Sequence, residues 1–391
     1  MDERRRIVPF FSAAHAPFVE AALCAGGCEA ELVCAGGEEM VHRGLAAVNN
    51  DACYAAILAA GRVLSACEQG RSAAQVAVPA LCHACRADDM PYLVARALEG
   101  AGTAGCGGAV VADAVEALRP GGLLPLLDKS AQRLLAAALV VGDAFLHIET
   151  HVRPRLPVDR RAAFGAALAG ERERALRFFA EEAAASSPFD ALAAIRAAEQ
   201  ALLPFASSPG AGMALPAVGI VGSAPPVFDA GINNGLVAHI EAEGCEAVLP
   251  YLGPLVSYAL RADGVSCTLA DELDSLAARL GDSELRRPCP TLAELERFGA
   301  AVVPGTITQG AGWAIAGQAR FFWEQGIRNV VYASVFGCLA GHVVGQGIMK
   351  RLRAHCPGIN LASVEYDPGT SPVNQTNRLK LLTTIAKRPR P

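Results

Sequence analysis

The sequence predicts an α/β protein of two Rossmann-like, doubly wound domains with a helical layer between them. Short apolar runs alternate with helical stretches in the first and last thirds of the chain, a pattern typical of parallel sheets covered by helices. Between them lies a long alanine-rich segment with helical charge spacing. We place the domain limits at residues 1–128 for the N-terminal α/β domain, 129–208 for the helical segment and 209–391 for the C-terminal α/β domain.

In the N-terminal domain, strand and helix signals follow one another closely. The first helix ends at Gly26-Gly27, and Asn49, Asn50 or Asp51 is the predicted N-cap of another helix. We predict strands at 7–11, 30–33, 75–79 and 109–112, and helices at 16–25, 51–67 and 91–99.

The C-terminal domain repeats this pattern after the linker Ser207-Ser208-Pro209-Gly210. In layout, Cys245-Glu246-Ala247 echoes the earlier Cys28-Glu29-Ala30. We predict strands at 217–221, 247–250, 329–333 and 360–364, helices at 233–243, 311–325, 342–355 and 372–386, and a variable helical stretch at 269–298.

Length and composition bound the class of protein. The chain has 391 residues, of which 52% are hydrophobic and 19% charged, so it can bury a sizeable core. At ~100–200 residues per domain, two domains are expected. The net charge of −5 argues against a nucleic-acid-binding surface, which needs a basic face.

No apolar run predicts a membrane span or a signal peptide. The most apolar stretch, Leu134 to Leu146, contains Gly142 and Asp143 and is shorter than the ~18–20 residues of a span. We therefore expect a cytoplasmic protein with reduced thiols. Its 13 cysteines, an odd number, fit a closed disulfide framework poorly. They are then core residues or ligands to a soft metal.

Three cysteines occupy positions where ligands bind in open α/β sheets. Cys85 follows the strand 75–79, Cys338 follows the strand 329–333, and Cys53 lies in the first turn of its helix. A helix N-terminus favours the thiolate, which is the metal-binding form. We expect these thiols to converge on one interdomain crevice. Nine other cysteines are predicted to be small residues of a reduced interior: Cys24, Cys28, Cys34, Cys67, Cys106, Cys245, Cys267, Cys289 and Cys356.

Two other motifs are less specific. Cys82-His83-Ala84-Cys85 is compatible with a thioredoxin-like dithiol or with half of a zinc site, although no matching second pair lies nearby. The glycine clusters 219–222 and 305–312 match neither a P-loop nor a dinucleotide-binding motif, which argues against nucleotide binding by this chain itself.

The C-terminal segment carries several polar side chains near the same crevice. Ser371 is a predicted N-cap, and Pro372 suits the first position of the helix that follows. Asn374, Gln375, Asn377 and Arg378 then fall in its first two turns. They either serve the turn and the cap or donate hydrogen bonds near a buried cluster or an acyl-CoA.

Four stretches carry a resemblance to a known family. They are Gly44 to Tyr54; Cys85-Arg86-Ala87; Gly310 to Trp313 with Phe336 to Leu339 and His342 to Gly345; and Tyr366 to Gly369 with Val373 to Gln375 and Asn377 to Lys380. Together they resemble the C-terminal part of the large fused activase proteins of the 2-hydroxyacyl-CoA dehydratase system. That module is related to iron–sulfur dehydratase subunits, benzoyl-CoA reductase subunits and double-cubane cluster proteins. The resemblance spans about residues 7–150 and 215–387.

The resemblance implies an iron–sulfur protein of anaerobic metabolism with its cluster between two Rossmann-like domains. Carried over by position, the ligands are Cys53, Cys85 and Cys338, which leave one iron of a 4Fe–4S cluster open. Cys82 is a reserve ligand for a larger cluster. An ATPase of the actin/sugar-kinase-like fold would supply low-potential electrons, and a homologous subunit or a second copy would pair with the chain. The candidate donors to an acyl-CoA or other small substrate are Arg86, Asn374, Gln375 and Arg378.

The chain departs from the family pattern at several positions. Leu81-Cys82-His83-Ala84 replaces a glycine-rich approach, Asp88-Asp89-Met90 replaces an aromatic residue and an asparagine, and Ala55 replaces a proline. These changes bear on the substrate pocket more than on the cluster. Three hypotheses follow: a dehydratase-like or reductase-like catalyst, a non-catalytic electron-transfer or scaffold subunit, and a thiol-disulfide protein using Cys82 and Cys85.

Overall fold

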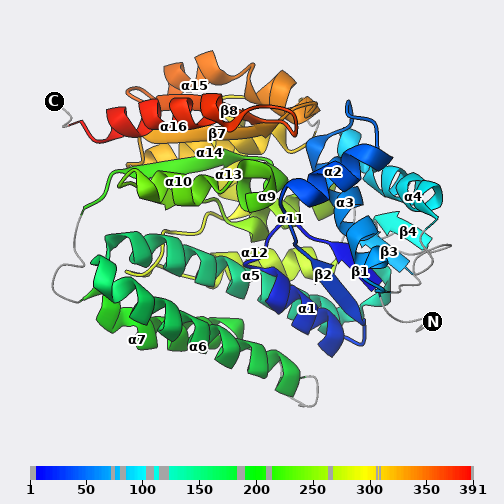
Figure 1. The fold of residues 1–391 in the computed structure, drawn as a ribbon. Helices are drawn as coiled ribbons and strands as arrows, with labels where there is room; N and C mark the ends of the chain where they lie inside the picture. Colours follow the sequence, from blue (N-terminus) through cyan, green and yellow to red (C-terminus); the bar gives the residue numbers. More distant parts are fainter. Residues whose placement is uncertain are drawn as a thin grey trace.

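Short apolar segments form two parallel four-stranded sheets (Figure 1). The computed structural model describes residues 6–71, 75–79, 85–102, 110–113, 123–182, 190–207, 214–262, 267–304, 307 and 310–388. Within these residues the strand orders are β2-β1-β3-β4 and β6-β5-β7-β8, with every pairing parallel. The predicted α/β class is confirmed at this level.

The strands lie close to their predicted positions. β7 is buried along its whole length, as expected for a parallel strand that helices cover on both faces. The N-terminal sheet comprises β1 (Arg6–Pro9), β2 (Ala30–Val33), β3 (Gln75–Val78) and β4 (Val110–Asp113). The C-terminal sheet comprises β5 (Ala217–Gly222), β6 (Glu246–Val248), β7 (Asn329–Val335) and β8 (Asn360–Tyr366).

The helices around the N-terminal sheet include one that the sequence pattern missed, α2, which starts after two glycines rather than at a polar cap. The next helix begins at Tyr54 with Cys53 as its N-cap, so the predicted cap at residues 49–51 is wrong. The elements are α1 (Ala16–Ala25), α2 (Glu38–Ala47), α3 (Tyr54–Glu68), η1 (Arg86–Asp89), α4 (Met90–Ala101) and η2 (Leu124–Leu126).

Helices around the C-terminal sheet are more numerous and shorter. The predicted helix 342–355 is two elements, a π-helix followed by an α-helix. The elements are α8 (Ala224–Phe228), α9 (Ala230–Asn233), α10 (Leu236–Ala242), α11 (Leu252–Ala262), α12 (Thr268–Arg279), α13 (Leu292–Ala300), α14 (Gly312–Glu324), η4 (Ala340–Gly345), α15 (Met349–His355) and α16 (Pro372–Ala386).

Glycine allows the same helix-to-strand turn in both halves. Gly27, after α1, has a φ of 78°, and Gly244, after α10, has a φ of 74°, values that L-residues rarely adopt. The next residue donates back into the helix in each case, from Cys28 N to Leu23 O at 2.8 Å and from Cys245 N to Ile240 O at 3.2 Å. The sequence echo therefore marks two equivalent turns into an edge strand.

The helical segment consists of α5 (Lys129–Val152), η3 (Arg153–Arg155), α6 (Val158–Glu182) and α7 (Ala191–Ala206). Of these helices, α5 contacts α1 on one side and α11 and α12 on the other, whereas α6 packs on α1 and α7 packs on α5. In Figure 1 the segment lies below the C-terminal half, with α6 and α7 outermost.

One helix in the described ranges, Lys129–Arg155, is long and apolar enough to cross a membrane by length and composition. In the fold, 72% of its most apolar window is buried. Its apolar surface is thus used in packing, as in the core helix of a globular protein.

The core is continuous between the two halves. One cluster of buried side chains joins residues of α3 and β3 to residues of β5, β7 and α16. A second cluster surrounds α5, and a third lies on the other face of the C-terminal sheet. Because the first cluster includes Cys53 and Cys338, the candidate cysteines lie where the two halves pack together.

Candidate functional site

Cys53 lies at the N-terminus of α3, where its side chain is buried. The backbone N–H groups of Ala55 and Ala56 face the thiol and favour its anionic form, as expected at the start of a helix. Burial is the largest effect, however, and it raises the pKa of Cys53 above its usual value.

Cys338 lies three residues after β7, at the start of the π-helix η4, and is also buried. The backbone N–H of Gly341 donates to its sulfur at 3.2 Å. Burial and then the neighbouring charge of Cys53 raise the pKa of Cys338 to about 12. Cys85 acts in the same direction, so all three thiols influence one another although they are far apart in the sequence.

Cys85 is half-buried at the start of η1, after β3. A loop of the other half lies against it. A Cβ placed on Gly310, just before α14, would lie 3.5 Å from the Cys85 sulfur and 3.1 Å from the Cβ of Ala340. The glycine cluster that precedes α14 therefore allows the backbone to approach the thiol closely.

Arg86 joins the three cysteine-bearing loops. Its Nη2 donates to the carbonyl oxygen of Asp51 at 2.6 Å, and its Nη1 donates to that of Gly337 at 3.3 Å. Asp51 lies two residues before Cys53, Gly337 lies one residue before Cys338, and Arg86 itself follows Cys85. The side chain that we expected to contact substrate is thus engaged in holding the loops at their mutual positions.

A buried tyrosine hydroxyl lies beside Cys338. Tyr332 points from β7 toward η4, and a Cβ on Gly341 would lie 2.9 Å from its oxygen and 3.2 Å from the Cys338 sulfur. The side chain of Ser334, on the same strand, also faces this hydroxyl. Burial and the nearby Cys338 raise the pKa of Tyr332, so it remains a neutral donor facing the thiol.

The three thiols lie close enough to affect one another electrostatically. The charge of Cys85 raises the pKa of Cys53, and the charges of Cys53 and Cys85 raise that of Cys338. In the part of the chain that is described, no group of three or more His, Cys, Asp or Glu side chains is arranged to hold a single ion.

The other cysteines are mostly free thiols. Cys67 is an exception because it is disulfide-bonded, so the expectation of a reduced residue there is wrong. Cys24 is exposed rather than internal. Cys82 and Cys106 lie outside the described residues, as do half of the glycine cluster 305–312 and most of the linker 207–210.

The polar residues of the C-terminal helix lie at the free edge of β8. Gln375 Nε2 donates to Glu365 O at 3.1 Å, and Arg378 Nη1 donates to Ser363 O at 2.9 Å. Both carbonyls belong to the edge strand of the sheet, where backbone groups lack a neighbouring strand. Gln375 also accepts from Asn234 Nδ2 at 2.8 Å.

A polar pocket of about 250 Å³ lies over this edge. Asn374, Gln375 and Arg378 line it together with Gln346, which directly follows η4. Glu365, another lining residue, is hydrogen-bonded to the His342 ring, and the backbone N–H of His342 donates to Cys338 O at 2.8 Å. The structure therefore brings the three tail residues together near the Cys338 loop, whereas Arg86 lies apart from them, between the two halves.

Sequence reasoning missed two residues of the site. Ser223 follows β5 and faces the Cys338 thiol. Its side chain offsets a small part of the rise in the pKa of that thiol. Its position after a buried strand and before Ala224-Pro225 is a recognisable N-cap signal. Tyr332 carries no such signal, because an aromatic residue inside an apolar strand usually belongs to the core.

Comparison with known proteins adds no assignment. No protein-family model matches the chain, and no curated protein matches it.

Proposed function

We propose that this chain is an iron–sulfur protein whose cluster is held by Cys53, Cys85 and Cys338 at the junction of two Rossmann-like domains. In this proposal, an ATP-hydrolysing partner supplies low-potential electrons. The chain uses them for the radical dehydration or reduction of an acyl-CoA or another small molecule. The observation that carries the proposal is the mutual proximity of these three thiols, which were singled out by their positions after strands or at a helix start.

The donor set fits such a group. Thiolates are the usual ligands of iron–sulfur clusters, and bound iron offsets the cost of burying their charge. In the absence of bound iron, burial keeps the Cys53 and Cys338 thiols protonated, because it raises the pKa of both. The Tyr332 hydroxyl lies beside the Cys338 sulfur, and glycines at 310 and 341 allow the backbone to approach the sulfurs of Cys85 and Cys338 closely.

When bound, the cluster would supply one-electron chemistry at low potential. The chain's own residues would then have three tasks. Cys53, Cys85 and Cys338 would ligate iron, and Arg86 would fix the spacing of the loops that carry them. Asn374, Gln375 and Arg378 would line a polar approach to the same region. Cys82 remains the proposed reserve ligand.

An electron-donating partner is supported by an apolar surface around Cys338. Phe336, Leu339 and Val343 flank this cysteine and are 42%, 38% and 65% exposed. Apolar side chains grouped beside a buried redox centre favour contact with another protein. We propose that the ATPase docks there in the cytoplasm. This surface also favours the second candidate, a carrier or scaffold subunit without catalysis of its own.

Anaerobic reconstitution tests the cluster. We expect about four irons and four sulfides per chain, with broad sulfur-to-iron charge-transfer absorption. Cys53→Ser, Cys85→Ser and Cys338→Ser should each lose most of the iron. Cys245→Ser is the matched control, because Cys245 is also buried but lies at the far end of the C-terminal sheet, before β6.

Iron-free protein after reconstitution would refute the cluster in both its catalytic and its carrier form. Dependence on Cys82 and Cys85 alone would instead support the dithiol hypothesis. To separate catalyst from carrier, the reconstituted protein is mixed with its ATPase, ATP and a 2-hydroxyacyl-CoA. Turnover without any further subunit supports catalysis, whereas reduction of the cluster without turnover supports the carrier.

A further inference from the structure

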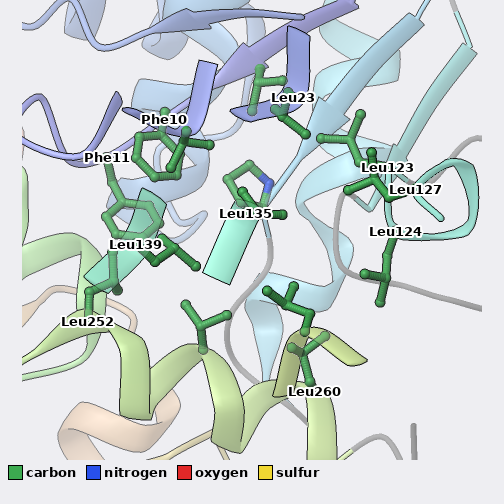
Figure 2. Close-up of a pocket in the computed structure, with 15 residues that line it drawn as sticks. Phe10, Phe11, Leu23, Leu123, Leu124, Leu127, Leu135, Leu139, Leu252 and Leu260 are labelled. Atoms are coloured by element: carbon green, nitrogen blue, oxygen red, sulfur yellow. The ribbon is translucent and has the colours of Figure 1, made fainter. Parts of the chain in front are cut away.

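A carbon-lined cavity lies at the carboxyl ends of β1 and β3, where Val8, Phe10, Phe11 and Pro79 form part of its wall (Figure 2). Its volume is about 90 Å³, and it is partly open. All 15 residues that line it are apolar. The walls come from both halves and from the helical segment: Phe10 and Phe11 follow β1, Leu23 lies on α1, Leu139 on α5, and Leu252 and Val256 on α11.

A buried hydrogen-bond chain holds these walls at fixed positions. Ser12 Oγ lies 2.7 Å from His15 Nδ1, and His15 Nε2 lies 3.0 Å from Asp143 Oδ1. The Asp143 carboxylate also accepts from Leu252 N at 2.8 Å and from Gly253 N at 2.9 Å. The end of β1, α1, α5 and α11 are thereby joined by buried polar contacts.

Close packing supports the same anchoring. A Cβ on Gly142 would lie 2.6 Å from the His15 ring, so this glycine allows α5 to pack closely against the histidine at the start of α1. Collapse of the cavity would require these buried hydrogen bonds to break, and a buried group left without its partner costs about 1–3 kcal/mol. The cavity therefore persists as a formed space instead of closing like an ordinary packing defect.

The lining determines what this space can hold. It offers no polar atom to a ligand, so neither a charged group nor a hydrogen-bonding group is favoured inside it. Enclosed apolar cavities stay dry, and one of roughly 150 Å³ takes up benzene. A partly open space of about 90 Å³ suits one small ring or a short branched chain.

We propose that this cavity is a binding site for a small apolar group, a six-membered carbon ring or a short branched alkyl chain. Its position at the carboxyl edge of a parallel sheet is where ligands enter open α/β folds. No cysteine lines the cavity, so binding of an apolar group there does not depend on the proposed iron–sulfur cluster.

Benzene is the probe for a direct test. The purified full-length chain is labelled on its Leu and Val methyl groups and titrated with benzene, and pyridine serves as a ring of the same shape with a polar atom. We expect saturable shifts of the Leu139, Leu252 and Val256 methyl signals with benzene, and at least tenfold weaker binding of pyridine. Near-saturating benzene should also raise the unfolding midpoint by roughly 1–2 °C.

Two variants make the test specific. Val256→Phe fills the cavity and should remove the benzene response, whereas Leu139→Ala enlarges it and should strengthen benzene binding at least threefold. Val158→Phe makes the same chemical change at an exposed position and should leave the response unchanged. The absence of saturable shifts in both the wild type and Leu139→Ala would overturn the proposal, as would an unchanged response in folded Val256→Phe.

Discussion

The N-terminal and C-terminal halves have the same plan but form different parts of the site. Each has a four-stranded parallel sheet in the same relative strand order. Each places a pair of closely packed helices before its third strand, α2 with α3 and α13 with α14. In both pairs a helical glycine lies against the backbone of the other helix: a Cβ on Gly61 would be 1.9 Å from Met40 O, and one on Gly317 would be 2.5 Å from Leu295 O.

The difference lies at the helix N-termini. In the first half α3 begins directly after its N-cap Cys53, and in the second half the equivalent helix α14 begins after Gly310. Gly310 lies against Cys85, which follows the third strand of the opposite half, while Arg86 joins the loop before Cys53 to the loop before Cys338. Each helix start thus meets the loop that follows the third strand of the opposite half. At the start of α3 this contact brings together two thiols, Cys53 and Cys338. At the start of α14 it brings together one thiol, Cys85, and Gly310.

A second difference concerns two glutamates at equivalent turns. Glu29, before β2, is exposed, whereas Glu246, the first residue of β6, is 1% exposed. Glu246 contacts His151, Arg155 and Arg287. Two of these three partners come from α5 and η3. Contacts with the helical segment therefore bury Glu246 among ion pairs, whereas the equivalent Glu29 stays exposed at the surface.

The largest effect is expected at the junction between the halves. Arg62 of α3 donates to both carboxylate oxygens of Asp229, at 2.7 and 2.9 Å, and both side chains are buried. Arg62→Leu should destabilise the protein by about 3–5 kcal/mol, because it leaves a buried carboxylate unpaired. Chemical denaturation measures this loss.

The double variant Arg62→Leu with Asp229→Leu is the control for that prediction. It should recover a large part of the stability, since no buried charge remains without a partner. A single variant as stable as the wild type would contradict the view that this ion pair joins the halves.

The two equivalent glutamates give the next effect. The contacts of Glu246 with His151 and Arg287 lower its pKa from 4.5 to about 2, even though burial acts in the opposite direction. A lowered folded-state pKa stabilises the protein fully above the unfolded value, and the contribution is lost as the pH falls from about 4.5 toward 2. Glu246→Gln should therefore cost roughly 3 kcal/mol at pH 7 and much less near pH 2.

Glu29→Gln is the matched control, because this exposed residue occupies the equivalent turn. Its effect should stay within about 0.5 kcal/mol at either pH. Urea denaturation at several pH values distinguishes the two variants. A pH-independent loss in Glu246→Gln would indicate a packing defect rather than the loss of ion pairs.

The smallest effects should come from the equivalent helix pairs. Gly61→Ala forces α2 and α3 apart and should cost roughly 1–3 kcal/mol, and Gly317→Ala should cost less because its clearance is larger. Gly165→Ala on α6, where nothing lies within 4 Å, should stabilise by roughly 0.5–1 kcal/mol. Thermal denaturation ranks the three, and equal losses at 61 and 165 would contradict the close approach.

By itself, the sequence predicted most elements of the fold because their signals are local. The helices 16–25 and 372–386 have the predicted bounds, since Gly26-Gly27 marks the end of the first and Pro372 the start of the second. Cys53, Cys85 and Cys338 were also recognisable from their places after strands or at a helix start. α2 was missed because it lacks a polar N-cap and follows two glycines.

Only the tertiary structure decided how these residues are used. Arg86, Gln375 and Arg378 were expected to face a substrate, but their hydrogen bonds go to backbone carbonyls of neighbouring segments. The burial of Glu246 and the carbon-lined cavity depend on the packing of α5 against both halves. Local patterns determine strands, helices and turns, whereas partners distant in the chain determine the charge, burial and contacts of each side chain.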